Sequence, residues 1–443
     1  MHKKYFALAS LGLIAITLFG YKVWIERGVD SMGLTEVEDG DAQFWLMQGS
    51  PNNRLTPCVV YYHFDQPLDE GLIRYRLEDL TSSYKMFQRN VVEIRGLPYW
   101  QAANVDWDKN FWILDPDEDI EAARLQAEHA VSKASELGSG LPLFRVFLSS
   151  DRKQLIFVWH HVISDLEGMF NKHAKHLFLE AGERTQFGYQ ISNAAGADTA
   201  TESADPQAPN PFTELYGSER SIGFSGTDYE VSRFELPMGD RELFELGRDA
   251  KLPMSDIFSF IALRATTIYE EKNDNQLPRP LISPISLRTS SLSMDEGNNR
   301  AIKAFPFVFP LEPVDAMHMR ILNLQPTASS YDTAGSLMRF ARRIPIFEPT
   351  LRRMAMPDFI SNYFPLADDT LFVDGAKLIG HTLRVPMVPY ERTKFAWSNY
   401  DGEVQLFLHT DPKLIDQALM VSAFLHASDE VLTYLSARSG VQN

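Results

Sequence analysis

The sequence contains a single cysteine, Cys58, among 443 residues. One thiol cannot form a disulfide within the chain, and a structural zinc site usually needs several cysteines or histidines. The eleven histidines show no HExxH or similar helical spacing, which catalytic zinc sites often use. We therefore expect no metal and no tightly bound cofactor.

Positive charge is also scarce, because 42 lysines and arginines stand against 59 aspartates and glutamates, for a net charge of -17. Nucleic-acid-binding proteins carry a basic patch, so this class is disfavoured, as is broad attachment to anionic lipid. The chain is 44% hydrophobic. Its length and apolar content predict a large core arranged in two domains or subdomains.

One long apolar run is present, from Tyr5 to Tyr21, and Val23 and Trp24 extend it. It reaches the roughly 20 residues that cross a bilayer. The alternative is a secretory signal peptide, but its apolar region is usually shorter, and no small-x-small cleavage site precedes Tyr21. We expect residues 1–27 to form an uncleaved single-pass membrane anchor.

The flanking charges determine the orientation of this anchor only poorly. Lys3, Lys4 and the α-amino group precede the apolar run, whereas Lys22 and Arg27 follow it. The balance favours a cytoplasmic N-terminus. That orientation would place the main domain outside the cytoplasm. The sequence does not decide on which side of the membrane the main domain lies.

The rest of the chain divides at a change of composition. Residues 191–213 are rich in Ala, Ser, Thr, Asp and Pro with almost no large apolar residue, which is typical of a flexible linker. The linker separates a folded segment over 28–190 from a second over 214–443. Strand and helix patterns mix without regular βαβ alternation, so we expect an α+β fold of two-layer mixed sheets with helices.

The pair His160 and His161 lies where a strand pattern gives way to a helix pattern. Residues 153–159 are apolar, aromatic and β-branched, as in a buried strand. Ser164, followed three residues later by Glu167, predicts a capping box at the start of the next helix. Histidine titrates near neutrality, at about 6.5, so a neutral imidazole here is suited to take a proton from a hydroxyl. A packed histidine with a satisfied hydrogen bond is the simpler interpretation of the pattern.

The histidines belong to the string His160-His161-Val-Ile-Ser-Asp165-Leu-Glu-Gly168, which resembles the HHxxxDG motif of the wax ester synthase/diacylglycerol acyltransferase family. More broadly, the chain resembles the chloramphenicol acetyltransferase-like fold shared with condensation domains of nonribosomal peptide synthetases. Weaker elements of that family occur in the same order along the chain: Asp41 to Trp45, Leu141 to Phe144, Met254 to Asp256, Pro284 to Arg288, Gly297-Asn298, Ser361-Asn362 and Ser398 to Gly402.

This resemblance implies two subdomains with a central tunnel, in which an acyl thioester enters from one side and an alcohol from the other. It places the general base on His161, with His160 packing or fixing the loop. Asp165 is counted with the catalytic residues because it is suited to orient His161, but the family pattern suggests a structural ion pair, for which Arg288 is our candidate. Gly168, Ser361, Asn362 and Ser398 are the expected structural or tunnel residues.

Two positions depart from the family pattern. Leu166 follows the motif aspartate, where the family has glycine, and a leucine there is expected to crowd the tunnel or reshape the start of the helix. Tyr363-Phe-Pro365 replaces a Val-Pro-Gly-Pro turn. Both departures are compatible with altered specificity or with loss of the reaction.

The resemblance favours an acyltransferase that moves an acyl group, expected to be long-chain, from acyl-CoA to a hydrophobic alcohol or diacylglycerol. Two alternatives stay open. One is transfer from an acyl carrier protein to a lipid or polyketide acceptor, which the acidic composition disfavours. The other is a catalytically silent, membrane-tethered binding or assembly protein, which Leu166 and an external main domain favour.

The expected ion pair yields a first prediction. If Asp165 and Arg288 are paired, Asp165→Ala and Arg288→Ala should be non-additive by about 0.5–3 kcal/mol in the free energy of unfolding. Urea unfolding of both single variants and the double variant measures this coupling. Strictly additive losses would exclude the pairing.

Overall fold

In this computed structural model the described residues are 29, 31–38, 42, 45–46, 57–94, 96–133, 135–138, 140–164, 166–178, 229–272, 279–286, 302–309, 314–322, 327–329, 359–387 and 391–439. The segments predicted as an anchor (1–27) and as a linker (191–213) lie outside them. Within the described ranges, no helix has the length and apolar character needed to span a bilayer.

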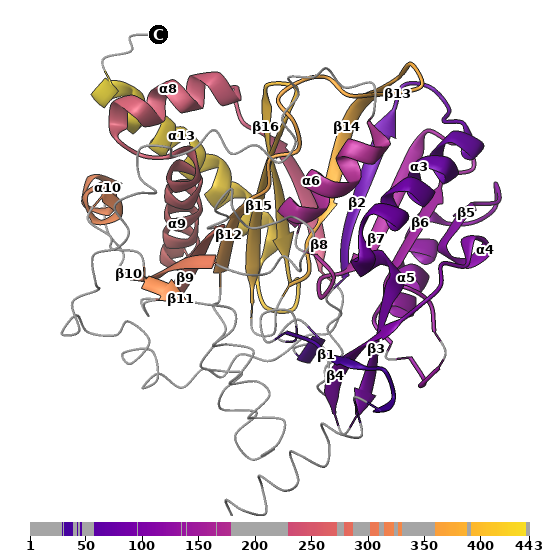
Figure 1. Ribbon diagram of the computed structural model, residues 1–443. Coiled ribbons are helices and arrows are strands. Elements are labelled where there is room, and N and C mark those ends of the chain that lie inside the picture. Colours follow the sequence, from indigo (N-terminus) through magenta and orange to yellow (C-terminus); the bar gives the residue numbers. More distant parts are fainter. Residues whose placement is uncertain are drawn as a thin grey trace, which may run out of the picture.

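The first large sheet has six strands in the order β13-β14-β2-β7-β6-β5. Their bounds are Pro57–Phe64 (β2), Phe111–Ile113 (β5), Phe144–Leu148 (β6), Gln154–His160 (β7), Phe372–Val373 (β13) and Ala376–Arg384 (β14). Helices cover both faces of this sheet (Figure 1). Alternate residues of β2 point to opposite faces, so Val60 and Tyr62 join one apolar cluster with α6, whereas Val59 and Tyr61 join another with α5.

The helices of this half are α3 (Glu70–Ser83), α5 (Ile120–Val131) and α6 (Leu166–Leu177), with the short α4 (Trp107–Asn110) and the 3₁₀ turn Lys85–Gln88. Asp69 and Asp119 cap α3 and α5 by accepting backbone N–H groups at 2.7 and 3.1 Å. A small separate sheet pairs β1 (Thr35–Glu36), β4 (Leu97–Ala102) and β3 (Arg89–Ile94).

The second large sheet has seven strands in the order β11-β10-β9-β12-β15-β16-β8. The bounds are Glu230–Glu235 (β8), Arg279–Ser286 (β9), Ile302–Phe309 (β10), Thr327–Ser329 (β11), Phe359–Tyr363 (β12), Thr393–Tyr400 (β15) and Glu403–Thr410 (β16). Four helices accompany it: α8 (Asp240–Ala250), α9 (Met254–Lys272), α10 (Val314–Leu322) and α13 (Gln417–Ser439). Figure 1 shows α9 and α13 packed together beside this sheet.

The two faces of β15 separate two cores. Phe395 and Trp397 lie in the apolar cluster formed with α9 and α13. Ala396 and Tyr400 lie in the cluster that also holds the core of the first sheet. The second sheet therefore buries one face against its own helices and the other against the first half of the molecule.

One strand joins the two halves directly. β14 comes from the C-terminal part of the chain but pairs antiparallel with β2 in the first sheet, from Leu378 opposite Phe64 to Arg384 opposite Val59. The division at residue 214 stays a prediction for the chain as a sequence of segments. In space, residues 372–384 belong to the sheet of the N-terminal half, a pairing between distant segments that strand patterns alone do not predict.

Candidate functional site

The end of β7 holds His160 in a closed environment. Its backbone N–H donates to the carbonyl of Leu143 at 3.0 Å, and its side chain is fully buried. The ring nitrogen Nδ1 accepts the backbone N–H of Val162 at 3.0 Å, and the ring of Trp45 lies 4.8 Å away. Burial and the neighbouring His161 hold the pKa of His160 well below 6.5. His160 is therefore a neutral, structural imidazole with its proton on Nε2.

His161 differs from its neighbour in exposure. It follows the last residue of β7 in a turn, and its side chain is only partly buried. The Nδ1 atom of His161 is itself buried, so only part of the ring is accessible. The roles expected for the two histidines stay predictions.

The turn that follows is tightly held. The backbone N–H of Ile163 donates to the carbonyl of His160 at 3.1 Å, and Trp159 Nε1 donates to the carbonyl of Ser164 at 3.0 Å. The predicted capping role of Ser164 is wrong. Helix α6 begins at Leu166, and Ser164 Oγ is buried without a hydrogen-bond partner in the described part of the chain. Ser164 lies one residue too early to cap this helix.

Leu166, which replaces the family's glycine, is packed in the core. Its side chain is 1% exposed and belongs to the same apolar cluster as Met169 and Phe170. Gly168 is also buried in α6. Whether Leu166 crowds a tunnel or reshapes the start of the helix stays a prediction. Asp165 and Arg288 lie outside the described residues, so their pairing stays a prediction.

Ser361 is a buried residue of the second large sheet. It lies in β12, and its side chain points into the C-terminal core, where Oγ accepts the Nε1–H of Trp397 at 3.1 Å. Asn362 pairs with Ala396 of β15 and its side chain belongs to the opposite face of β12, toward the first half of the molecule.

Asn362 places a polar atom between the second sheet and the first half of the molecule. Its Oδ1 is buried and meets no hydrogen-bond donor within the described ranges. An unsatisfied buried carbonyl costs about 1–3 kcal/mol, so this position is suited to a water molecule or a ligand donor. The role of Asn362 as a tunnel residue stays a prediction.

Ser398 makes a polar contact between the two large sheets. Its hydroxyl donates to the carbonyl of Phe364 at 2.7 Å, and Nε2 of His381 in β14 lies 2.9 Å from the same oxygen. With the hydroxyl proton directed at Phe364, the imidazole N–H must donate to Ser398 Oγ. Ser398 therefore links the crossing strand to the second sheet, a connecting role that its sequence motif did not predict.

His381 is a buried histidine that sequence reasoning missed. Its ring lies among Phe170 of α6, Tyr400 and Phe407, at centroid distances of 6.5, 6.1 and 5.5 Å. Burial, with smaller contributions from Arg233 and His63, lowers its pKa to about 3. Its place in a strand pattern at 376–384 was the only available signal, and that strand was not predicted.

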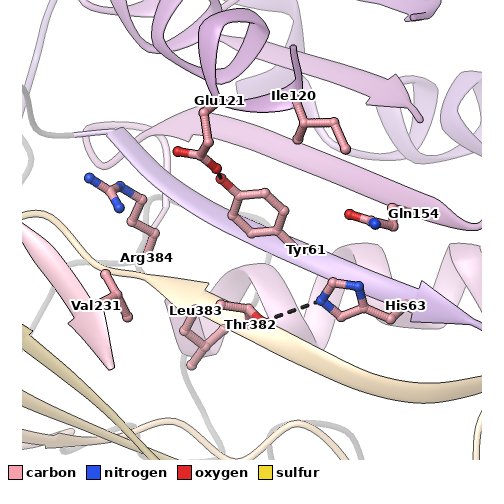
Figure 2. Close-up of a pocket in the computed structure, with 9 residues that line it drawn as sticks. All are labelled: Tyr61, His63, Ile120, Glu121, Gln154, Val231, Thr382, Leu383 and Arg384. Atoms are coloured by element: carbon pink, nitrogen blue, oxygen red, sulfur yellow. Dashed lines mark hydrogen bonds between the residues drawn. The ribbon is translucent and has the colours of Figure 1, made fainter. Parts of the chain in front are cut away.

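A partly open pocket of about 460 Å³, shown in Figure 2, lies apart from the motif. Tyr61 and His63 of β2, Thr382 and Arg384 of β14 and Glu121 of α5 line it, among others. Neither His160 nor His161 is part of its lining. The central tunnel implied by the resemblance stays a prediction.

Comparisons with known proteins identify the fold. No family model matches the chain, and no curated protein matches its sequence. A variant of the starter condensation domain of rhizomide synthetase RzmA, in complex with C8-CoA and Leu-SNAC, matches with a TM-score of 0.58 and 12% identity over 93% of this chain and 96% of that one. The first condensation domain of the CDA synthetase matches with a TM-score of 0.54 and 12% identity, over 92% of this chain and 96% of that one.

The wax ester synthase/diacylglycerol acyltransferase from Marinobacter aquaeolei VT8 matches with a TM-score of 0.50 and 14% identity, over 92% of this chain and all of that one (100%). The expected resemblance is thus confirmed at the level of the fold. The chain has the α+β architecture of condensation domains and of this wax ester synthase. Sequence identities this low establish a similarity of fold only.

The buried histidines predict a specific pH dependence. His381 is uncharged in the folded protein, with a pKa of about 3, whereas an unfolded histidine titrates near 6.5. Below about pH 6.5 the unfolded chain binds a proton that the folded chain does not, so each such histidine lowers the free energy of unfolding by up to about 1.4 kcal/mol per pH unit. The contribution of His381 to stability is therefore largest above pH 6.5 and falls as the pH drops.

We predict that His381→Phe loses less stability than the parent protein between pH 6.5 and 5, even if it is less stable overall. Urea unfolding at several pH values measures the slope. His426→Phe, at an exposed histidine of α13, is the matched control and should keep the parent slope. Identical slopes for His381→Phe and the parent would contradict a neutral His381.

Proposed function

We propose that the protein is an acyltransferase that moves an acyl group from a thioester to the hydroxyl of a hydrophobic alcohol or diacylglycerol. The observation that carries this proposal is the pair at the end of β7, in which His160 is neutral and packed and His161 is partly accessible. The fold supports it as well, because similar structures include a condensation domain bound to C8-CoA and a wax ester synthase. We propose acyl-CoA as co-substrate.

In the proposed reaction, the neutral imidazole of His161 takes the proton of the acceptor hydroxyl as its oxygen attacks the thioester carbonyl. The tetrahedral intermediate then collapses, the C–S bond breaks and the proton passes to the departing thiolate. An ester and a thiol are formed. No covalent acyl-enzyme is required, so a single base in a rigid loop is sufficient.

The other motif residues act on position rather than on the reacting atoms. His160 holds the backbone at Val162, and the carbonyl of His160 accepts the N–H of Ile163. These contacts fix the turn that carries His161, and general-base catalysis is sensitive to displacements of about 1 Å. Asp165 would stabilise the same loop through its predicted ion pair.

The expected outcome is ester formation from a long-chain acyl-CoA and a fatty alcohol or diacylglycerol. His161→Ala should reduce the rate by at least about 100-fold, the usual contribution of a general base. Thin-layer or mass-spectrometric detection of the ester measures it. His173→Ala, in α6 beyond the motif, is the matched control and should keep the activity.

Equal activity of His161→Ala and the parent would exclude His161 as the base. If the parent protein forms no ester with any acyl-CoA, a carrier-bound acyl donor should be tried next. If that donor also fails, the silent binding protein is favoured, and Leu166 would then be its clearest departure from the family motif.

The membrane anchor is part of the same proposal, because a tethered enzyme meets lipid substrates where they partition. A topology reporter fused to the C-terminus tests the side of the membrane that carries the main domain. A cytoplasmic signal is expected if acyl-CoA is the donor, because acyl-CoA is a cytoplasmic metabolite. An external signal would require a different donor or favour the binding protein.

A further inference from the structure

We propose that the cavity in Figure 2 is a second binding site, for an uncharged small molecule that carries hydroxyl groups and a short hydrocarbon portion. Its volume of about 460 Å³ lies within the range of small-molecule pockets, roughly 300–1,000 Å³. The proposal goes beyond the acyl transfer, because it requires neither an acyl donor nor His161.

The cavity lies on one face of three neighbouring strands. His63 of β2 is opposite Gln154 of β7, and Tyr61 of β2 is opposite Thr382 of β14. The N-terminal end of α5 and Val231 of β8 complete the walls. Residues from both halves of the chain therefore line this cavity, and the crossing of β14 into the first sheet is what brings them together.

One end of the cavity is polar but uncharged. His63 and Gln154 lie at this end in Figure 2, and His63 Nε2 is 3.3 Å from Thr382 Oγ1. Burial and the nearby Arg233 lower the pKa of His63 below 6.5, which keeps its imidazole neutral at pH 7. Imidazole, carboxamide and hydroxyl groups all donate and accept hydrogen bonds, as an alcohol does.

The charged groups at the other end are already compensated. Glu121 accepts hydrogen bonds from the Tyr61 hydroxyl at 2.7 Å and from Arg124 Nε at 2.8 Å. Arg384 lies over the ring of Tyr229 at 4.3 Å, donates to its carbonyl at 3.1 Å, and forms an ion pair through Nε with Glu128 Oε1 at 4.0 Å. An ionic ligand would find no unbalanced opposite charge here, and burying its charge would cost free energy.

The middle of the cavity is apolar. The ring of Tyr61 lies between the two ends in Figure 2, and Ile120 and Val231 contribute aliphatic surface. A short hydrocarbon chain can pack there while its hydroxyl groups reach His63, Gln154 and Thr382. This combination selects an amphipathic alcohol over a fully polar or an ionic molecule.

The site is separate from the histidine loop. Pro57 of β2 pairs with His160, and Tyr61 lies four residues farther along the same strand. At about 3.3 Å per residue, Tyr61 is about 13 Å from that pair along β2. Binding in the cavity and catalysis at His161 can therefore be measured independently.

The test uses the full-length protein and three probes with the same carbon chain: hexane-1,2-diol, hexanoate and hexylammonium. Saturation-transfer NMR and titration measure binding without any acyl donor. We expect saturable binding of the diol and at least roughly 10-fold weaker binding of either ion, because a buried charge needs a partner. Equal binding of all three probes, or no saturable binding of the diol, would overturn the proposal.

Variants locate the binding. Thr382→Val keeps the branched shape of the strand residue but removes its hydroxyl, and Gln154→Leu removes the carboxamide. Each should weaken diol binding roughly 2- to 10-fold, the range of one net hydrogen bond. Thr35→Val, at an exposed threonine of β1, is the matched control and should bind like the parent.

Unchanged affinity in both pocket variants would place the diol elsewhere and refute the site. His161→Ala should keep full diol binding, which separates this inference from the proposed reaction. Loss of ester formation with intact diol binding would leave the cavity proposal standing. Loss of diol binding in the pocket variants with intact ester formation would show that the two sites are independent.

Discussion

The geometry of the histidine loop depends on one buried, uncharged imidazole. A charged His160 inside the apolar cluster would be costly, and the fold avoids that cost by keeping the ring neutral and giving Nδ1 the backbone N–H of Val162. The same contact holds the turn in a single shape. His161 lies in this turn, directly after the last residue of β7, and its side chain is partly buried.

A second constraint is the crossing of β14 between the two halves. Its pairing with β2 and the contact between His381 and Ser398 join the first sheet to the second. The apolar cluster shared by Phe170, Ala396 and Phe407 makes this junction a continuous core rather than a loose domain contact. The seam beside α6 and the separate cavity on the α5 side therefore belong to one packed structure, on opposite faces of the same sheet.

Much of the local structure could be predicted from the sequence. The apolar strand pattern over 153–159 and the change to a helix after His160 agree with β7 (Gln154–His160) and α6 (Leu166–Leu177). Prediction was least successful where tertiary contacts decide. Ser164 was expected to cap a helix, but the helix begins two residues later. Ser361 was expected to be a structural or tunnel residue, and its hydroxyl oxygen accepts a hydrogen bond from Trp397.

The sequence by itself determined which residues form the main strands and helices, and it placed two histidines at the end of a strand, because these features depend on neighbours along the chain. Only the tertiary structure decided which histidine is closed, which face of β12 looks toward the first half, and that β14 joins a sheet begun more than 300 residues earlier. These outcomes depend on pairing and burial between distant segments. Hydrophobic periodicity predicts that a residue is buried, but it does not predict which distant segment packs against that residue.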